Sequence, residues 1–349
     1  MIMFDLAVLL RENIRNIKPY SSARDEYSGA DGVFLDANEN PFGSVVEGDF
    51  NRYPDPYQRA VKEKLSSLKK VEIEQVFLGN GSDEPIDLLF RAFANPSKDN
   101  VIIMPPTYGM YQVCADINDV EVRKVSLTPD FEIREKEVLA AVDENTKIIF
   151  VCSPNNPTGN LLSTEKIETL LNSFSGLVVI DEAYIDFANS KSWVSRLNEF
   201  PNLLILQTFS KAWGMAALRI GMAFASSEII SVLNTIKYPY NINVLTQQKA
   251  LEALDNVAKK DAFVNQIYEQ RLFLKKVFET MNIERIYPSD SNSLLIKVKG
   301  AHDVYNALVK KLIIVRDRSS VTLCDDCLRV TIGTQIENEL LIHELKGLL

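Results

Sequence analysis

Six short apolar runs between residues 75 and 225 constrain the fold of this chain more than any other feature. Within each run the apolar residues follow one another without polar alternation. This pattern is typical of strands that are buried on both faces of a mostly parallel sheet. The runs are QVFLG (75–79), VIIM (101–104), KIIFVC (147–152), LVVID (177–181), LLILQ (203–207) and IGMAFA (220–225). The sequence therefore predicts an α/β domain with a mostly parallel central sheet.

Helix start signals lie before and between these runs. Ser82-Asp-Glu-Pro85 combines acids and a proline in a first helical turn, and an apolar helical pattern follows it. Asp55-Pro56 opens a similar pattern that continues to Leu68. Helices that separate buried strands indicate a layered α/β architecture.

The pattern changes beyond residue 240. A helical stretch at about 244–280, which can break once, precedes short strands and helices. Few strands with helices on one side predict a smaller α+β domain. We expect an arm at 1–30 that packs on the small domain or on a partner subunit, a large domain at 31–240 and a small C-terminal domain at 241–349. The expected strands of the small domain are LLIKV (294–298), IIVR (313–316) and CLRVTIG (327–333).

The charge balance limits what this chain can bind. It has 38 Lys and Arg residues against 47 Asp and Glu residues, so its net charge is −9. This acid excess argues against a general nucleic-acid binder and against a polybasic protein of the membrane surface. No apolar stretch reaches the roughly 20 residues that cross a membrane, and residues 1–17 favour an amphipathic helix over a signal peptide. An anionic ligand would have to be bound by a few local cations.

The cysteines indicate a reduced, cytoplasmic protein. Cys114, Cys152, Cys324 and Cys327 are too few for a disulfide framework in 349 residues. Cys324 and Cys327 have the spacing of a metal-binding pair, but no second pair and no nearby histidine completes a zinc site. We therefore expect two reduced cysteines in a loop of the small domain and no metal.

Polar residues gather where the apolar runs end. Ligands bind at the carboxyl ends of strands in an open α/β sheet. The segments at these ends are Gly79–Asp83, Ser153–Gly159, Asp181–Tyr184 and Thr208–Lys211, with Arg219 after them. They bring together a helix N-terminus, an amide, a carboxylate, a phenol, a lysine and an arginine.

Pyridoxal 5'-phosphate needs this set of groups. Its aldehyde requires a lysine, which Lys211 provides, and its pyridine nitrogen stays protonated only beside a carboxylate such as Asp181. Asn156 and Tyr184 can donate to its 3'-oxygen. Its phosphate requires backbone N–H groups at a helix start and a fixed cation. The residues that match the phosphate are Gly81, Ser82, Asp83, Ser210 and Arg219.

Each of these residues also has a structural interpretation. Ser82 and Asp83 could cap a helix, and Asn155–Gly159 could form an ordinary turn. Tyr108 and Tyr184 could be core aromatics. Their joint occurrence at the ends of successive strands favours function.

Three motifs in this order resemble those of fold-type I, class II aminotransferases that depend on pyridoxal phosphate. They are PNNPTG (154–159), DEAY (181–184) and SKAWGMAALRIG (210–221). Further motifs resemble the histidinol-phosphate aminotransferase branch of this family: DANENPFG (36–43), RYPDP (52–56), GNGSDE (79–84), PPTYGMY (105–111), PYNIN (239–243), VRDR (315–318) and LRVTIGT (328–334). The resemblance covers nearly the whole chain, and it implies transamination between histidinol phosphate and 2-oxoglutarate in histidine biosynthesis.

The resemblance also implies roles for residues outside the strand ends. Tyr108 should stack on the cofactor ring, and Tyr53 should reach the cofactor phosphate of the other subunit, so that a homodimer shares its active sites. Arg329 should hold the α-carboxylate of glutamate. With Arg316, and with help from Tyr20, it should also hold the phosphate of histidinol phosphate. Asn38 should line the substrate side.

Lysine chemistry is favoured over histidine chemistry. The only histidines, His302 and His343, fall in expected surface helices of the small domain, so we expect neither to act as an acid or base. The amine of Lys211 should carry the proton instead, with Asp181 and Tyr184 as its catalytic partners.

Other enzymes of the same fold are alternatives. A threonine-phosphate decarboxylase also binds an amino phosphate compound, and an aromatic amino-acid aminotransferase performs the same exchange. Ser291-Asn292-Ser293 and the AWGMAALRIG segment depart from the branch's usual pattern. A cofactor-sensing regulator would need a DNA-binding module, for which the first 30 residues are neither long nor basic enough.

Overall fold

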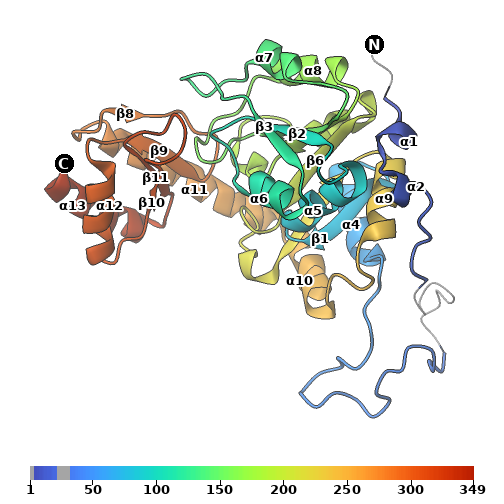
Figure 1. Ribbon diagram of the computed structural model, residues 1–349. Helices are drawn as coiled ribbons and strands as arrows, with labels where there is room; N and C mark the ends of the chain where they lie inside the picture. The colour runs from blue at the N-terminus through green and yellow to red at the C-terminus, as the bar shows by residue number, and fades with distance from the viewer. Residues whose placement is uncertain (1–3, 22–31) are drawn as a thin grey trace.

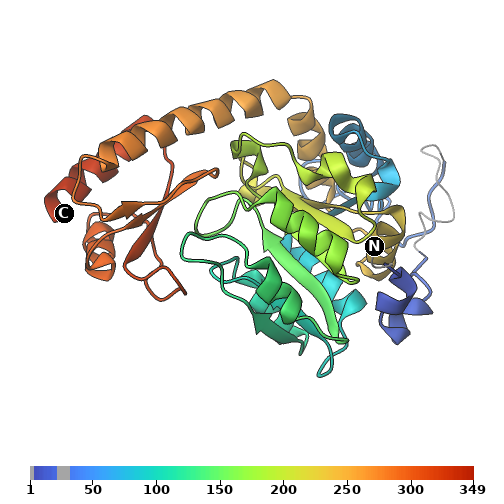
Figure 2. The same cartoon turned by 90° about the horizontal axis from the view of Figure 1, so that it is seen from above.

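The computed structural model describes residues 4–21 and 32–349. Figure 1 shows a larger unit built around one sheet and a smaller C-terminal unit beside it. In the larger unit, helices cover both faces of the sheet, as Figure 2 shows from above. The protein therefore has the predicted mixed α/β architecture.

The central sheet has seven strands in the order β1-β7-β6-β5-β4-β2-β3. Of the strands in residues 32–349 that form this sheet, β7 alone runs opposite to the other six. The strands are β1 (Val76–Asn80), β2 (Asn100–Ile103), β3 (Glu121–Lys124), β4 (Thr146–Cys152), β5 (Leu177–Asp181), β6 (Leu203–Thr208) and β7 (Ile220–Phe224). All six predicted strands are confirmed. The edge strand β3 was not predicted, because its sequence EVRK is short and charged and its side chains are at least partly exposed.

Burial on both faces explains why the apolar runs do not alternate. In β5, Val178 and Ile180 belong to one hydrophobic core, whereas Leu177 and Val179 belong to the core on the other face. Each of these four residues is fully buried. A strand covered on both faces requires apolar side chains at every position.

Helices of the larger unit connect the strands. They are α4 (Arg59–Lys69), α5 (Asp83–Phe93), α6 (Met110–Ile117), α7 (Glu135–Ala140), α8 (Thr164–Ser173), α9 (Ser227–Ile236) and α10 (Val244–Leu254), with 3-10 turns η1 (Ile73–Gln75), η2 (Ile185–Phe187), η3 (Trp193–Glu199) and η4 (Ala216–Leu218). The start signal at residues 82–85 is confirmed by α5. The α4 helix begins later than Asp55-Pro56, because Gln58 is left-handed and the Asp55 carboxylate accepts the N–H groups of Tyr57 and Arg59.

The smaller unit contains a four-stranded antiparallel sheet in the order β10-β11-β9-β8. Its elements are α11 (Val257–Phe278), β8 (Arg285–Ile286), β9 (Ser293–Lys297), α12 (Ala301–Lys310), β10 (Arg316–Asp317), β11 (Cys327–Thr331) and α13 (Gln335–Leu348). The expected helical stretch breaks once, between α10 and α11. Figure 2 shows α11 (orange) running from the larger unit to the smaller one. Since α10 still packs on α4, a division near residue 255 fits the packing better than one at 240.

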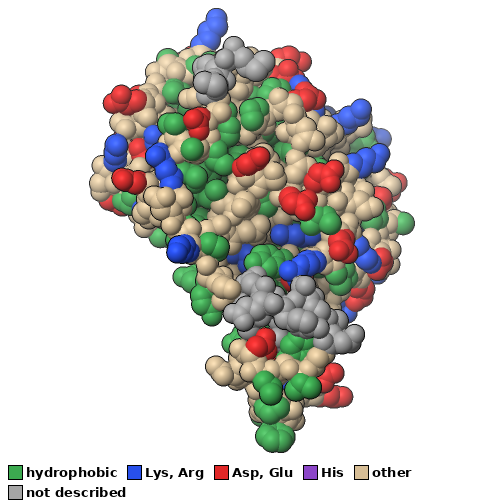
Figure 3. All heavy atoms as spheres, turned by 90° about the vertical axis from the view of Figure 1, so that its right-hand side faces the viewer, with side chains coloured by type: hydrophobic (Ala, Val, Ile, Leu, Met, Phe, Trp, Pro, Cys, Tyr) green, Lys and Arg blue, Asp and Glu red, His purple; other side chains and the backbone are tan. Residues whose placement is uncertain are grey.

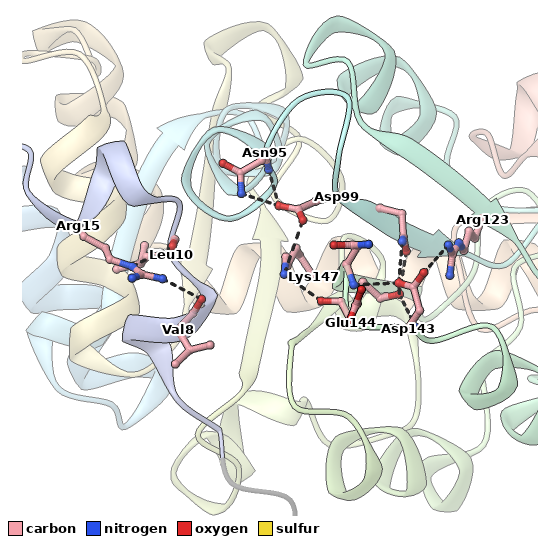
Figure 4. Close-up of polar contacts among 12 residues, drawn as sticks. Val8, Leu10, Arg15, Asn95, Asp99, Arg123, Asp143, Glu144 and Lys147 are labelled. Carbon is pink, nitrogen blue, oxygen red and sulfur yellow. Dashed lines mark hydrogen bonds and ion pairs between the residues drawn. The ribbon is translucent and has the colours of Figure 1, made fainter.

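The N-terminal segment packs on the larger unit. The expected single helix is two short helices, α1 (Leu6–Leu9) and α2 (Glu12–Arg15). Leu9 is buried in the core of the larger unit. The backbone N–H of Arg11 donates to the Ala92 carbonyl at the end of α5 (3.0 Å), and its guanidinium donates to the Arg91 carbonyl (2.9 Å). Arg15 donates back to the carbonyls of Val8 and Leu10 (Figure 4).

The expectation that this arm packs on the small domain is therefore wrong. An amphipathic pattern shows that one face is buried, but it does not say against which partner. Packing on a partner subunit stays a prediction. Residues 1–3 and 22–30 of the expected arm lie outside the described residues.

An extended segment at 32–53 precedes α4. It has no helix or strand, and Figure 1 shows it standing away from the rest of the chain. Apolar side chains on it are almost fully exposed, including Leu35 (86%), Phe42 (97%) and Val45 (101%). Figure 3 shows hydrophobic side chains on the part that projects below the body. Exposed apolar side chains gathered on one segment indicate a surface that binds another molecule.

Every helix in the described residues is either too short or too polar to cross a lipid bilayer.

We predict that the N-terminal segment stabilises the larger unit through Leu9. Leu9→Ala should lower the free energy of unfolding by about 2–4 kcal/mol, because it leaves a cavity beside α5. Urea unfolding followed by circular dichroism measures this change. The matched control is Val8→Ala, since Val8 is 70% exposed. Equal unfolding midpoints for the two variants would contradict the assigned packing.

Candidate active site

A cavity of about 830 Å³ opens where the carboxyl ends of the central strands face the β10–β11 region of the smaller unit. Its size is that of a small-molecule site. The structure brings most of the predicted residues together here. The predicted residues that line the cavity are Ser82, Asp83, Tyr108, Asn156, Asp181, Tyr184, Ser210, Lys211, Arg219, Arg316 and Arg329.

Asp181 is the buried acid of this site. It ends β5, and only 2% of it is exposed. The Tyr111 hydroxyl donates to its Oδ2 atom (2.7 Å), and the Ala183 backbone N–H donates to its Oδ1 atom (3.0 Å). Burial raises the pKa of Asp181, and these two donors oppose that rise by stabilising the ionised form. A cationic ring nitrogen in the cavity would offset the cost of burying this charge.

Lys211 lies on the cavity wall just after β6. Its Nζ atom is 5.5 Å from the centre of the Tyr184 ring. Desolvation and the positive charge of Arg329 lower the pKa of Lys211, while Asp181 opposes this. A lowered pKa increases the fraction of neutral amine, which is the form that attacks an aldehyde.

Tyr184 is a proton donor at neutral pH. Burial raises its pKa to about 12, although the nearby Arg329 favours the ionised phenol. It follows Asp181 by three residues, so the end of one strand supplies both a carboxylate and a phenol.

A tight turn before α5 forms the second part of the site. Gly81 has a φ of +73°, and a Cβ atom there would lie 2.6 Å from the Nη2 atom of Arg219. A Cβ atom on Gly221 would lie 2.3 Å from the carbonyl carbon of Gly81. Glycine is therefore required at both positions, because it lets β7 and Arg219 approach the turn closely.

Arg219 is held at this turn. It donates from Nη1 to Ser210 Oγ (3.3 Å), and its Nη2 atom is 3.5 Å from Asp83 Oδ2. Tyr108 donates its hydroxyl to Asp83 Oδ1 (3.0 Å). The Gly81 N–H donates to the Arg219 carbonyl (3.0 Å), so Gly81 contributes space rather than a free donor. Ser82 makes no side-chain cap bond to α5, which removes the capping interpretation.

Positive charges dominate the opposite end of the cavity. Arg316 in β10 lies directly opposite Arg329 in β11, so two guanidinium groups share one face of the small sheet. Like charges at such positions are unfavourable unless an anion lies between them. Arg329 donates to Asn156 Oδ1, and no carboxylate of the described residues forms an ion pair with Arg316 or Arg329. This end can therefore bind an anion.

Gly81 forms the turn beside the cavity without lining it, and three further predicted residues lie outside the cavity. Tyr20 is 72% exposed and Tyr53 is 51% exposed, and Tyr53 stacks on Tyr240 at 4.5 Å. Asn38 is exposed on the extended segment and has a φ of +54°. A single chain does not bring these residues to the cavity, so their expected roles stay predictions.

Sequence reasoning missed two residues that the structure places in the site. Tyr111 follows Tyr108 by three residues, or about one helical turn, and this spacing is its only signal. A tyrosine in an apolar helix is otherwise predicted to be a core residue. Arg318 lines the cavity beside Arg316. Its signal is the alternation of arginines in VRDR, which places both on one face of a strand.

The histidines and the cysteine pair lie elsewhere. His302 and His343 are both exposed in α12 and α13, as expected, and His302 contacts Asp317 (2.8 Å). Cys324 and Cys327 are free thiols, fully buried in a hydrophobic cluster with residues of the larger unit. Among the described residues, no group of three or more His, Cys, Asp or Glu side chains is arranged to hold a metal ion.

Comparison with known proteins decides the family. The family described as aminotransferase class I and II matches residues 33–345. The chain belongs to this family. This aminotransferase is 57% identical to the histidinol-phosphate aminotransferase of Cytophaga hutchinsonii, over 98% of its own length and 99% of that protein.

Solved structures share the fold of this aminotransferase. The histidinol-phosphate aminotransferase from Sinorhizobium meliloti in complex with pyridoxal-5'-phosphate matches with a TM-score of 0.77 and 21% identity, over 90% of each chain. The L-threonine-O-3-phosphate decarboxylase from Porphyromonas gingivalis matches with a TM-score of 0.72 and 22% identity, over 85% of this chain and 93% of that one. Since both reactions occur on this fold, the fold alone does not choose between them.

We predict that Tyr111 keeps Asp181 ionised in this aminotransferase. Tyr111→Phe removes a donor to the carboxylate, so the pKa of Asp181 rises further and the ionised fraction falls at a given pH. The acid limb of the pH profile of kcat/KM should move to higher pH. At neutral pH, kcat/KM should fall by about tenfold. Steady-state rates between pH 5 and 9 measure it. Tyr305→Phe, in the smaller unit, is the control, and an unmoved acid limb in Tyr111→Phe would refute the assignment.

Proposed function

We propose that this aminotransferase exchanges the amino group of L-histidinol phosphate with 2-oxoglutarate, giving imidazole acetol phosphate and glutamate in histidine biosynthesis. The observation that carries the proposal is the facing pair Arg316 and Arg329, which lacks an acidic partner among the described residues and shares one cavity with Lys211 and Asp181. The relative that is 57% identical over nearly the full length of both chains is a histidinol-phosphate aminotransferase, which supports the substrate assignment.

Pyridoxal 5'-phosphate fits the end of the cavity that Lys211 and Asp181 form. Asp181 offers a buried carboxylate to the ring nitrogen, Lys211 an amine to the aldehyde, and Tyr184 a phenol to the 3'-oxygen. Arg219, Ser210 and the start of α5 would hold the phosphate. Glycine at 81 and 221 lets Arg219 and β7 approach this turn closely. When bound, the cofactor supplies an electron sink for negative charge that develops on the substrate carbon.

Lys211 is the residue that moves the proton. Its lowered pKa increases the neutral fraction of the amine at a given pH. The neutral amine can accept a proton from the substrate Cα atom and later return it to the second substrate. Tyr184, with a pKa of about 12, remains a donor throughout. Neither histidine lines the cavity.

The arginine pair explains how one site accepts two different substrates. Arg329, positioned against Asn156, can hold the α-carboxylate of glutamate with one planar guanidinium group. The phosphate of histidinol phosphate is close to a dianion and occupies the corresponding place, so Arg316 adds the second charge. The protein carries a net charge of −9, and these local cations therefore provide the attraction for anionic substrates.

We further propose that the active enzyme is a cytoplasmic homodimer with shared active sites. The extended segment at 32–53 exposes apolar side chains that a second copy of the chain would cover. Tyr53 and Asn38 lie on this segment, outside the cavity of their own chain. A partner's Tyr53 would then complete the phosphate site, as the family resemblance implies, and Tyr20 and Asn38 would line the substrate side.

The proposed substrate is tested by single half-reactions with the cofactor-loaded enzyme. Histidinol phosphate should change the visible absorbance of the bound cofactor faster than phosphothreonine or phenylalanine does. Arg329→Ala should weaken histidinol phosphate and glutamate together, whereas Arg316→Ala should weaken the phosphate substrate by about tenfold more than glutamate. Release of carbon dioxide from phosphothreonine would favour the decarboxylase alternative, and a preference for phenylalanine would favour the aromatic aminotransferase.

Shared active sites are tested by mixing two inactive variants. Lys211→Ala lacks the amine, and Tyr53→Ala lacks the residue proposed to cross to the other subunit. Half of the randomly mixed dimers would combine both chains, and each would contain one intact site, so about one quarter of wild-type activity should return. Each variant mixed with itself serves as the control. If activity does not rise on mixing, the sites are not shared through Tyr53.

A further inference from the structure

Three arginines, rather than two, line the anion-binding end of the cavity. The third, Arg318, has no role in the function proposed above. Its backbone N–H donates to the Cys327 carbonyl (2.8 Å), which continues the pairing of β10 with β11 by one residue. Alternate residues of a strand point to the same face, so Arg318 shares a face with Arg316 and with the opposing Arg329.

Arg318 is an unpaired cation in this site. Its Nε atom is buried and has no hydrogen-bond partner in residues 4–21 and 32–349. No carboxylate of the described residues forms an ion pair with it. A buried guanidinium nitrogen without a partner is unfavourable, because it has lost water and gained nothing in return. An anion bound in the cavity would supply the missing acceptor.

The acids of the cavity cannot supply that acceptor. Among its lining residues only Asp83 and Asp181 are acidic. Asp83 is paired with Arg219 and accepts from Tyr108, and Asp181 accepts from Tyr111 and Ala183. The three arginines are therefore left without a carboxylate partner among the described residues.

Arg318 lines the same cavity as Tyr184. Together with Arg329 it favours ionisation of the Tyr184 phenol, so its charge acts on the same region. Its own pKa is lowered by burial and then by the charges of Arg329 and Arg316. Three cations that raise one another's energy are a binding site for an anion with more than one charge.

We propose that Arg318 is the third guanidinium group of a phosphoryl-binding site and sets the preference for a phosphate monoester over a carboxylate. This inference rests on the proposed function and adds to it a residue that determines specificity. A carboxylate has two oxygens and one charge, which the planar guanidinium group of Arg329 can satisfy. A phosphate monoester has three terminal oxygens and nearly two charges, so the third arginine gains a partner only when phosphate is bound.

The test compares the two half-reactions in Arg318→Gln, Arg318→Lys and wild-type enzyme. In Arg318→Gln, kcat/KM for histidinol phosphate should fall by about 10- to 100-fold, mainly through KM, and kcat/KM for glutamate by less than about threefold. Arg318→Lys should recover only part of the loss, because an ammonium group lacks the planar fork. Arg59→Gln, a half-exposed arginine outside the cavity, is the matched control.

Equal losses for the two substrates in Arg318→Gln, or no loss for either, would overturn the inference. Thermal unfolding of each variant separates a folding defect from a binding defect. A wild-type enzyme that does not react with histidinol phosphate would refute the proposed function instead. Arg318 would then be tested by inhibition of the glutamate half-reaction with propyl phosphate and acetate. Arg318→Gln should raise the inhibition constant of propyl phosphate about tenfold or more and leave that of acetate unchanged.

Discussion

A carboxylate held in the interior is the constraint on which the rest of this site depends. Asp181 ends a strand that is covered on both faces, so it cannot reach bulk water. Two hydrogen-bond donors, from Tyr111 and from the backbone of Ala183, offset part of the cost of keeping it charged. The remainder must come from a cation in the cavity, since an unpaired buried charge is strongly unfavourable. A positively charged cofactor ring beside Asp181 would compensate the buried charge before any substrate binds.

The other end of the cavity carries an excess of positive charge. Arg316, Arg318 and Arg329 face the same space from the small antiparallel sheet, without a carboxylate partner among the described residues. The buried carboxylate of Asp181 belongs to the larger unit, and the three arginines belong to the smaller one. A substrate that carries an amine and an anion is oriented by this arrangement, because its two ends are attracted to different walls. Specificity then depends on how many arginines the anion can occupy.

The sequence predicts the interior better than it predicts contacts between surfaces. Strands buried on both faces have a composition that little else shares, and all six were predicted within about two residues. The short edge strand β3 carries two basic residues and an acid, so its sequence gives no such signal. The N-terminal helices show the limit of periodicity. The periodicity places Leu9 on the apolar side of the N-terminal helix. The core that this side packs against is decided by the whole tertiary structure.

The site could be predicted as far as strand ends determine it. Lys211, Asp181 and Arg219 converge because the polar residues that follow successive parallel strands lie at one edge of the sheet. Tyr111 could not be recognised as a site residue from the sequence. Its hydroxyl reaches Asp181 only because the fold places α6 next to the end of β5. Tyr20, Asn38 and Tyr53 remain outside the cavity because a single chain does not carry them there.

The reversed direction of β7 has a consequence for the evolution of the segment that connects β6 to β7. Because β7 runs against its neighbours, its first residues, rather than its last, lie at the ligand-binding edge. Phe209 and Ile220 close the intervening segment through a backbone hydrogen bond, with Lys211 near one end and Arg219 at the other. The exposed positions Ala216 and Ala217 can be exchanged. The number of residues between the amine and the guanidinium, however, cannot change without separating these two groups. Insertions and deletions should be selected against here even where individual substitutions are tolerated.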